Sequence, residues 1–227
     1  MKISILTLFP EIFESVFSKS ITKRALDNKI LEIKLINIRD FGIGKHRQVD
    51  DNPYGGGKGM VLMPQPVLSA LNLIKPKPYT ILLSASGRKY SHVFAKKFAR
   101  KKNLAIICGR YEGVDSRVEK YTDEIITVGD YILTGGEIPA MILVDSITRF
   151  LPGYLNPKSL VDESFEKGLL EYPQYTRPQD YKGLKVPSIL LSGNHKQIRA
   201  WRKKQSLKRI KKFRPDLLIE SITQNEK

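Results

Sequence analysis

Three glycine-rich loops are the first candidates for chemistry in this chain of 227 residues. They read SASGRK at 84–89, CGRYEGVD at 108–115 and VGDYILTGGE at 128–137, and each follows an apolar run typical of a buried strand. A fourth glycine-rich segment, PYGGGKGM, occupies 53–60. Glycine lets the backbone approach a ligand closely or supplies positive φ in a tight turn. Open α/β sheets bind ligands outside the carboxyl ends of their strands, so the three post-strand loops predict one shared pocket there.

The pocket does not have the sequence of a common nucleotide-binding loop. A Walker A loop requires Gly-Lys followed by Ser or Thr, which binds Mg²⁺. Here Lys58 is followed by Gly59 and Met60, and the dinucleotide pattern G-x-G-x-x-G is absent. The sequence therefore favours neither a P-loop enzyme nor a conventional dinucleotide fold.

Cysteine and histidine content excludes further classes. Cys108 is the single cysteine, so no disulfide framework exists, and it ends an apolar run, which predicts a buried, inert thiol. No Cys/His group has metal-ligand spacing, so we predict no protein-bound metal. Met1–Thr7 carries one lysine and no small-residue cleavage site, and no apolar run reaches membrane-spanning length. We expect no signal peptide, no membrane partner and a cytoplasmic location.

Charge indicates a polyanionic partner. Lys and Arg number 39 against 23 Asp and Glu, a formal net charge of +16. From Tyr172 to Pro215 the chain has thirteen Lys or Arg and one acid, Asp180. A generally lysine-rich proteome is the alternative explanation, but this uneven distribution favours a binding surface for nucleic acid.

Hydrophobic patterns predict the elements that position these loops. Strands are expected at Ile3–Phe9, Leu31–Ile38, Tyr79–Ser84, Leu104–Cys108 and Ile125–Val128. Helical spacing appears in Ile12–Phe17, in Tyr90–Phe98 and in Glu137–Leu151, whereas residues 39–60 have no periodicity. Strands alternating with helices predict an α/β domain with a mainly parallel sheet. A polar stretch broken by Pro and Gly at 152–168 separates it from a helical C-terminal segment, where Asn194 is a plausible N-cap and Trp201 lies on an apolar face.

Several long motifs carry a family resemblance. The segments DDNPYGGGKGM, CGRYEGVDSR, VGDYILTGGEIPAMILVDSITRF, GLLEYPQYTRP and VPSILLSGNHKQIRAWR resemble the bacterial tRNA (guanine-N1)-methyltransferases of the TrmD type, from the first strand to about Pro215. The resemblance implies a SPOUT-type α/β fold with a deep trefoil knot and a small helical C-terminal domain. It implies a homodimer with active sites at the subunit interface, and transfer of a methyl group from S-adenosylmethionine to N1 of the guanosine at tRNA position 37, next to the anticodon.

The resemblance also implies a domain organisation. Residues 1–155 are expected to form the knotted, cofactor-binding catalytic domain, 156–171 a mobile linker carrying the general base, and 172–227 a basic, mainly helical tRNA-binding domain. In that last domain, basic side chains are expected to contact phosphates, which position RNA without specifying its sequence: Arg199, Arg202, Lys203, Lys204, Lys208 and Arg209. For Trp201 we favour a helix-face core role over stacking on a base.

The family's cofactor-contacting positions map onto the post-strand loops. One departure is Ala85, where a proline is usual in the family. A Mg²⁺ requirement of the reaction stays open. The residues implied to bind S-adenosylmethionine are Gly109, Glu112, Val128, Gly129, Asp130, Tyr131, Ile132, Leu133, Gly135 and Gly136.

Methylation of guanine N1 requires a general base, because N1 carries a proton, and positive charge near O6 stabilises the resulting anion. By resemblance, Arg149 in DSITRF supplies that charge. Aligned on Ser164-Phe165, the position of the base holds Glu163, and Asp162 stands one residue earlier. We favour Glu163, with Asp162 as the alternative. Two other functions are weighed: a related knotted methyltransferase acting on ribosomal RNA, and a non-catalytic RNA-binding protein.

Overall fold

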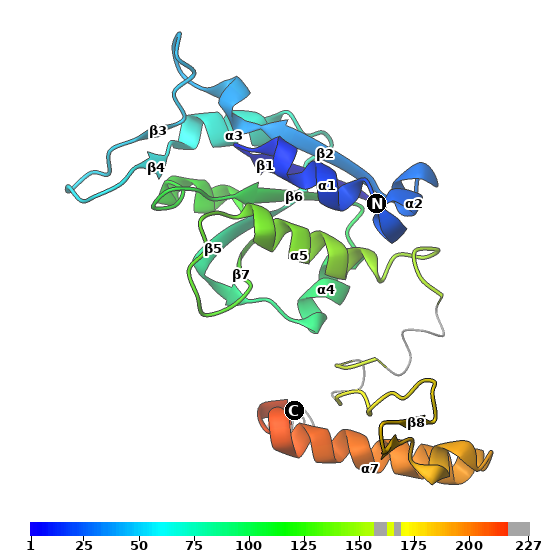
Figure 1. Ribbon diagram of the computed structural model, residues 1–227. Coiled ribbons are helices and arrows are strands. Elements are labelled where there is room, and N and C mark those ends of the chain that lie inside the picture. Colours follow the sequence, from blue (N-terminus) through cyan, green and yellow to red (C-terminus); the bar gives the residue numbers. More distant parts are fainter. Residues whose placement is uncertain (157–162, 166–168, 218–227) are drawn as a thin grey trace, which may run out of the picture. The chain divides into compact units, whose positions relative to one another are not determined.

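A five-stranded parallel sheet forms the centre of the first part of the chain (Figure 1). Its strand order is β2-β1-β6-β5-β7, so the chain does not add strands in sequence order. This confirms the expected α/β architecture with a mainly parallel sheet. The strands are β1 (Lys2–Thr7), β2 (Glu32–Asn37), β5 (Tyr79–Lys89), β6 (Asn103–Cys108) and β7 (Glu124–Thr127).

The central strands β1 and β6 are buried on both faces, which explains their nearly continuous apolar sequences, whereas the edge strand β2 exposes Glu32 and Lys34. In β1, Ile3 and Ile5 belong to one hydrophobic cluster, whereas Leu6 belongs to the other. In β6, Ile106 lies on the first face and Ile107 on the second, and both are fully buried. The two clusters therefore follow the two-residue period of a strand.

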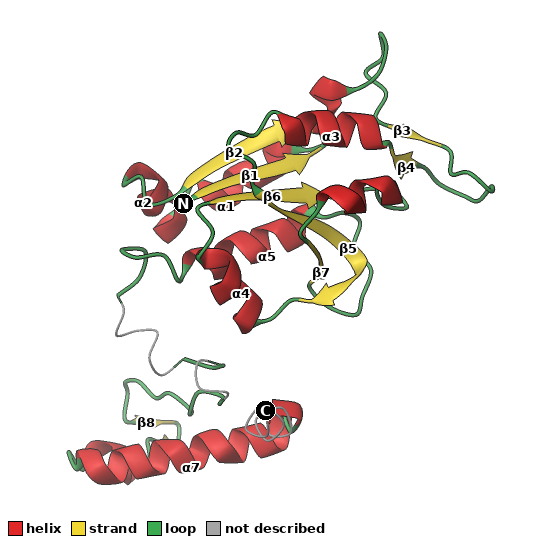
Figure 2. Ribbon diagram, turned by 180° about the vertical axis from the view of Figure 1, so that it is seen from behind, coloured by secondary structure: helices red, strands yellow, loops and turns green. Residues whose placement is uncertain are grey.

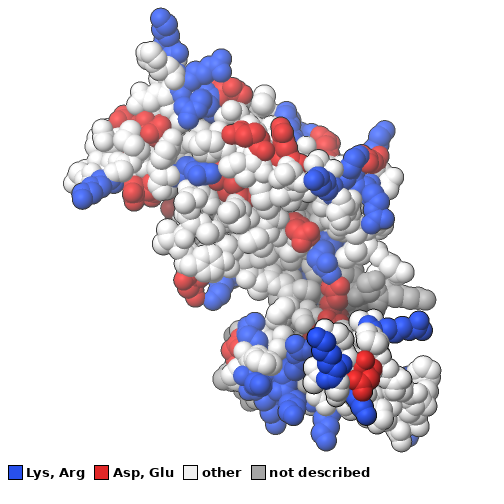
Figure 3. Space-filling view, viewed as in Figure 1, with Lys and Arg blue, Asp and Glu red and all other residues white. Residues whose placement is uncertain are grey.

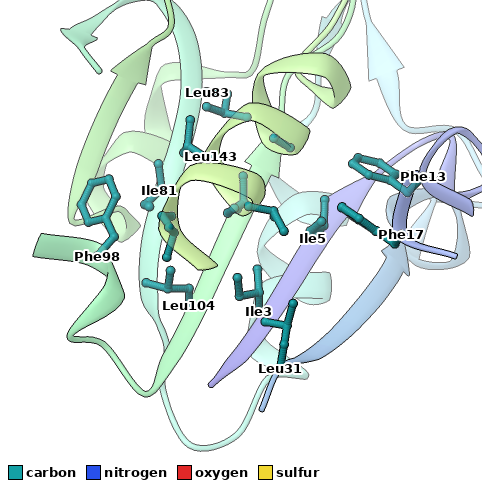
Figure 4. Packing of buried hydrophobic residues seen from close by; sticks show 14 of the residues in the cluster. Ile3, Ile5, Phe13, Phe17, Leu31, Ile81, Leu83, Phe98, Leu104 and Leu143 are labelled. Atoms are coloured by element: carbon teal, nitrogen blue, oxygen red, sulfur yellow. The ribbon is translucent and has the colours of Figure 1, made fainter. Parts of the chain in front are cut away.

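Helices on the first face build the larger cluster. Figure 1 shows α1 and α5 in front of the sheet, and Figure 4 shows Phe13, Phe17, Phe98 and Leu143 packed around its strands. The helical spacing over Ile12–Phe17 corresponds to a 3₁₀ turn followed by one α-helical turn. The elements on this face are η1 (Pro10–Phe13), α1 (Glu14–Phe17), α2 (Ser20–Asp27), α4 (His92–Ala99) and α5 (Glu137–Thr148).

The second face is covered by α3 (Pro64–Asn72), which Figure 2 shows from that side. Two 3₁₀ helices, η2 (Ile38–Phe41) and η3 (Ser116–Tyr121), flank it. The predicted elements do not include α3, although Val67, Ala70 and Leu71 have helical spacing and Pro64 stands at its first position.

Strand β5 continues beyond the predicted end at Ser84. Its register with β7 shifts between Leu83 and Arg88, so residues 84–87 leave the ladder and Arg88 and Lys89 pair again. Gly87 is required at this crossing, because a Cβ there would lie 2.5 Å from the backbone nitrogen of Ile126. The bulge therefore interrupts the pairing of β5 with β7 close to the carboxyl ends of β6 and β7, where the other two glycine-rich loops begin.

A short hairpin, β3 (Asp50–Asp51) and β4 (Val61–Leu62), lies within the region predicted to have no periodicity and just beyond it. Two-residue strands are too short for a hydrophobic pattern to reveal them.

The chain divides into two compact units, Met1–Leu155 and Asn156–Lys227. This computed structural model describes residues 1–156, 163–165 and 169–217. In the second unit, α7 (His195–Phe213) follows η4 (Ser188–Leu191), and a two-stranded sheet precedes them: β8 (Asp180–Tyr181) and β9 (Leu184–Lys185). The predicted N-cap is confirmed, since Oδ1 of Asn194 accepts a hydrogen bond of 3.1 Å from the backbone of Gln197.

Candidate active site

A cavity of about 280 Å³ lies beside the bulge of β5 and the carboxyl ends of β6 and β7. The three glycine-rich loops that follow these strands all contribute to it, as the sequence predicts. The lining is Leu82–Ala85, Gly109–Val114, Ile126–Val128 and Tyr131–Gly136, together with Glu119 and Pro139.

Most residues that the family resemblance assigns to the cofactor line this cavity: Gly109, Glu112, Val128, Tyr131, Ile132, Leu133, Gly135 and Gly136. Gly129 and Asp130 lie beside the cavity without lining it. Gly129 is buried against the Tyr131 ring, where a Cβ would come within 2.3 Å of Cε1, and thus supports that ring. Asp130 pairs with Lys89 at 2.9 Å on the surface, and Ala85, the family departure, is part of the lining.

Backbone hydrogen bonds join the loops. The amide of Gly136 donates to the carbonyl of Gly109 at 2.9 Å, and Arg110 and Gly135 form an antiparallel bridge. Gly136 has no room for a side chain, because a Cβ would lie 2.7 Å from the Cα of Cys108. This close approach fixes the loop after β6 against the first turn of α5.

A buried ion pair supports the same junction. Nε of Arg110 lies 2.9 Å from Oε2 of Glu137, whose side chain is 2% exposed. The two atoms are not aligned as a hydrogen bond, so the contact is electrostatic. The other carboxylate oxygen of Glu137 accepts a hydrogen bond of 2.8 Å from Thr7 Oγ1. Sequence reasoning missed Arg110 and Glu137 as partners, although both stand inside the quoted motifs.

The rim of the cavity exposes apolar side chains. Tyr131 is 55% exposed and Ile132 is 84% exposed. Exposed apolar surface beside a cavity is typical of a ligand or partner site, because its burial on binding is favourable. The lining contains two acidic residues, Glu112 and Glu119, and Glu112, in the loop after β6, is suited to balancing a positively charged group.

Cys108 ends β6 beneath this cavity and is fully buried, as predicted. Burial raises the pKa of its thiol well above the ordinary value, and the negative charge of Glu137 adds to this, whereas Arg110 opposes it. The thiol is therefore kept neutral and unreactive.

The candidate catalytic residues lie in different units. Arg149 directly follows α5 and is half-buried in the first unit. Glu163 is half-buried in the second unit, and Asp162 lies outside the described residues. Next to Glu163, the hydroxyl of Ser164 accepts a hydrogen bond of 2.9 Å from the backbone of Glu171, and the guanidinium of Arg214 lies 5.8 Å from the Phe165 ring centroid. The second of these contacts places Phe165 beside the residue that follows α7.

Helix α7 presents most of the predicted phosphate contacts to solvent, and Figure 3 shows Lys and Arg gathered over its unit. Arg202 is the exception, because its guanidinium lies 4.5 Å from the Tyr172 ring centroid and the residue is half-buried. Trp201 is half-buried beside Tyr175, with 6.4 Å between ring centroids, in agreement with a packing role. The exposed residues are Arg199, Lys203, Lys204, Lys208 and Arg209.

The described residues contain neither a cluster of metal-ligating side chains nor a membrane-spanning helix. Within 1–156, 163–165 and 169–217, no three His, Cys, Asp or Glu residues are grouped as a metal site. No helix in those same ranges has the length and apolar character needed to cross a membrane.

A parallel α/β unit with a loop-lined cavity, joined to a basic helical unit, is typical of an enzyme that binds a small ligand and a polyanion. Comparison with known proteins identifies the family. The family model described as tRNA (Guanine-1)-methyltransferase TrmD matches residues 1–220. The chain belongs to this family.

Curated relatives are similar over almost their whole length. A tRNA (guanine-N(1)-)-methyltransferase of Dictyoglomus turgidum is 52% identical over 229 residues, covering 100% of this chain and 94% of the relative. That of Geobacillus kaustophilus is 54% identical, covering 97% of this chain and 92% of the relative. That of Staphylococcus epidermidis is 52% identical, covering 96% and 91% respectively.

Proposed function

We propose that this enzyme transfers a methyl group from S-adenosylmethionine to N1 of a guanosine in tRNA, at position 37 next to the anticodon. Membership of the methyltransferase family supports the reaction. The observation that carries the proposal is the cavity, because all three glycine-rich loops meet there and eight residues assigned to the methyl donor line it.

The cavity suits the methyl donor. Its volume of about 280 Å³ is near the lower end of ligand pockets, which span roughly 300–1,000 Å³. Gly135 and Gly136 bring backbone into the lining of the cavity, where backbone donors and acceptors are able to read an adenine edge. Tyr131 and Ile132 would enclose the apolar parts, and Glu112 would offset the sulfonium charge. The bound donor supplies the methyl group, and the protein must prepare the guanine.

Preparation of the guanine is assigned to Glu163 and Arg149. Glu163 accepts the proton from N1, which gives the ring nitrogen a lone pair for attack on the methyl carbon. The bond between that carbon and the donor sulfur breaks, its electron pair stays on sulfur, and the neutral demethylated donor leaves. Arg149 stabilises the negative charge that develops on O6. The target base must leave its stack so that its Watson–Crick edge is accessible. Asp162 is the alternative base, since it is one residue from Glu163.

The resemblance supplies the remaining parts of the proposal. They are a deep trefoil knot and catalytic role for residues 1–155, a base-carrying linker over 156–171, and tRNA binding by 172–227. They also include a homodimer with the active site at the subunit interface and action in the cytoplasm. The exposed basic side chains of α7 support tRNA binding, because phosphates attract such a surface. A Mg²⁺ requirement is tested by adding a chelator to the reaction.

One experiment tests the function. The protein is incubated with S-adenosylmethionine carrying a labelled methyl group and with tRNA transcripts, and the modified base is mapped. We expect 1-methylguanosine at position 37, and no product when that guanosine is replaced by adenosine. Methylation of ribosomal RNA instead of tRNA would favour the first alternative, a related methyltransferase acting on ribosomal RNA. Binding of tRNA without any methyl transfer would favour the second alternative, a non-catalytic RNA-binding protein.

A further inference from the structure

The loop of the β3–β4 hairpin is a glycine-rich segment for which the proposed function gives no role. Figure 1 shows the hairpin projecting from its unit. Tyr54 in this loop is 100% exposed, more than any other large apolar or aromatic residue among the described residues. A fully exposed aromatic ring contributes nothing to the core, so its role must be sought outside the fold.

The glycines of this loop are not explained by packing. Gly55 and Gly56 have φ of 86° and 79°, and an added Cβ at either would meet nothing within 4 Å. Gly57 has φ of 134°, and only the Pro53 ring lies near, at 3.7 Å. The loop therefore has a backbone conformation that favours glycine. No other part of the described chain packs on Gly55 or Gly56, so a partner has room beside Tyr54.

The base of the hairpin is attached to the wall of the cavity. The carbonyl of Met60 accepts a hydrogen bond of 3.0 Å from the amide of Glu112, and the amide of Leu62 donates to the carbonyl of Gly113 at 3.0 Å. A Cβ at Gly59 would lie 2.5 Å from Cγ of Glu112, so the loop backbone packs on that side chain. Glu112 and Gly113 line the cavity, so β4 and the residues just before it contact the wall of the cavity directly.

The loop that carries Tyr54 also carries a cation, Lys58. Lys58 is exposed and forms no ion pair with any residue in the described part of the chain. An exposed aromatic ring with a cation in the same loop is the composition of a stacking platform for single-stranded nucleic acid.

We propose that Tyr54 stacks on an unpaired base of the RNA substrate that flanks the target guanosine, with Lys58 contacting an adjacent phosphate. This inference rests on the proposed function, because it takes tRNA as the ligand. Unpaired loop bases are the part of RNA that proteins read by stacking on aromatic side chains. A duplex offers no free base face, so the proposal specifies a single-stranded loop.

Salt dependence separates stacking from charge contacts. Affinity for a tRNA transcript is measured at several salt concentrations with the full-length protein and the demethylated donor product present. We expect Tyr54→Ala to weaken binding by about 5- to 150-fold, the weight of one base stacked on an aromatic side chain. The slope of log K against log salt should stay unchanged, because stacking releases no counterions. Lys58→Ala should instead reduce the slope by about 0.7.

Matched variants control this experiment. Tyr54→Phe keeps the ring and should keep wild-type affinity. Tyr121→Ala removes another exposed tyrosine, 57% exposed and at the end of η3, and should have no effect on tRNA binding. Because Tyr54 makes no packing contact, Tyr54→Ala should leave the free energy of unfolding and the affinity for S-adenosylmethionine unchanged.

Three results would overturn the inference. They are unchanged tRNA affinity in Tyr54→Ala, a fall in the salt slope equal to that of Lys58→Ala, and a changed oligomeric state by sedimentation, which would make Tyr54 a protein contact. Binding is measured without turnover, so its result does not depend on methyl transfer. If the proposed function were wrong, the wild-type protein itself would fail to methylate guanosine, whereas the three results above concern only the role of Tyr54.

Discussion

Nε of Arg110 and Oε2 of Glu137 lie 2.9 Å apart, and this ion pair connects the loop after β6 to the first turn of α5. Glu137 also accepts a hydrogen bond from Thr7 at the end of β1. One buried carboxylate thus joins three elements below the cavity. Gly135, two residues before Glu137, leaves space for this pair, because a Cβ there would lie 2.3 Å from Nε of Arg110.

Glu137→Gln tests the contribution of that charge. Glutamine keeps an oxygen for Thr7 but leaves the Arg110 guanidinium without its partner. Breaking a buried pair costs about 3–5 kcal/mol, and the Arg110 side chain is 19% exposed, so we expect a loss of roughly 1–3 kcal/mol in the free energy of unfolding. Denaturant titration measures this. Thr7→Val removes the hydrogen bond to this carboxylate but keeps the ion pair, and it should cost about 1.5–3 kcal/mol, the weight of a hydrogen bond to a charged group. Equal stability of Glu137→Gln and wild type would show that the pair contributes nothing.

Gly136→Ala tests the close approach of the loops. The new methyl group would lie 2.7 Å from Cα of Cys108 and 2.9 Å from the amide nitrogen of Gly109, which are backbone atoms that cannot rotate away. We expect a loss of about 1–3 kcal/mol of stability, with weakened binding of S-adenosylmethionine by calorimetry. In Gly109→Ala the nearest atom is the Leu83 carbonyl oxygen at 3.3 Å, so the effect should be smaller. A larger effect at Gly109 would contradict the geometry.

The buried thiol of Cys108 predicts a pH dependence. Its pKa is raised in the folded state above the ordinary value of 9.0, so below that pH the thiol is protonated in both states. Above it, the unfolded chain loses the proton first, and stability should fall by at most about 1.4 kcal/mol per pH unit. Denaturation of wild type and Cys108→Ala between pH 8 and about 10.5 measures the difference. Burial also raises the pKa of Tyr90 to about 12, and this cancels because both proteins contain Tyr90. Parallel pH curves for the two proteins would exclude the effect.

The two linker carboxylates are separated by nearly isosteric substitutions. If Glu163 is the general base, Glu163→Gln should slow methyl transfer by about 10²–10⁴-fold, while binding of tRNA and cofactor is preserved. Asp162→Asn should cost far less. The rate of Glu163→Gln should rise with pH, because hydroxide replaces the missing base. The reverse ranking would assign the proton transfer to Asp162, and two active variants would exclude both.

Helix α7 predicts a salt dependence of tRNA binding. Lys203 and Lys204 are exposed on it, and their replacement by alanine should reduce the slope of log K against log salt by about 1.5 if both contact phosphates. Lys75 and Lys77 form a matched control with the same change of charge, since they are exposed before β5, at the edge of the sheet opposite the cavity. An equal reduction in both double variants would mean that general charge, and not contact by α7, governs binding.

Local features of the sequence determined the class of fold and the position of the cavity. Buried parallel strands are short, continuous apolar runs, and such runs are visible wherever they occur, as in Leu104–Cys108. Carboxyl ends of parallel strands share one edge, so the loops at Gly109 and Gly135 were expected to meet. The N-cap at Asn194 was predicted because such a cap is a local contact: its partner Gln197 is three residues away.

Contacts between distant segments were decided only by the tertiary structure. The carboxylate of Glu137 reaches Thr7, 130 residues earlier, and no local pattern marks such a pair. The bulge at 84–87 depends on how β7 passes Gly87, and the stacking of Arg202 on Tyr172 depends on how the chain folds back on α7. Residue type shows which groups are able to interact. Which of them meet depends on strand order and packing, because these bring together residues that the sequence keeps far apart.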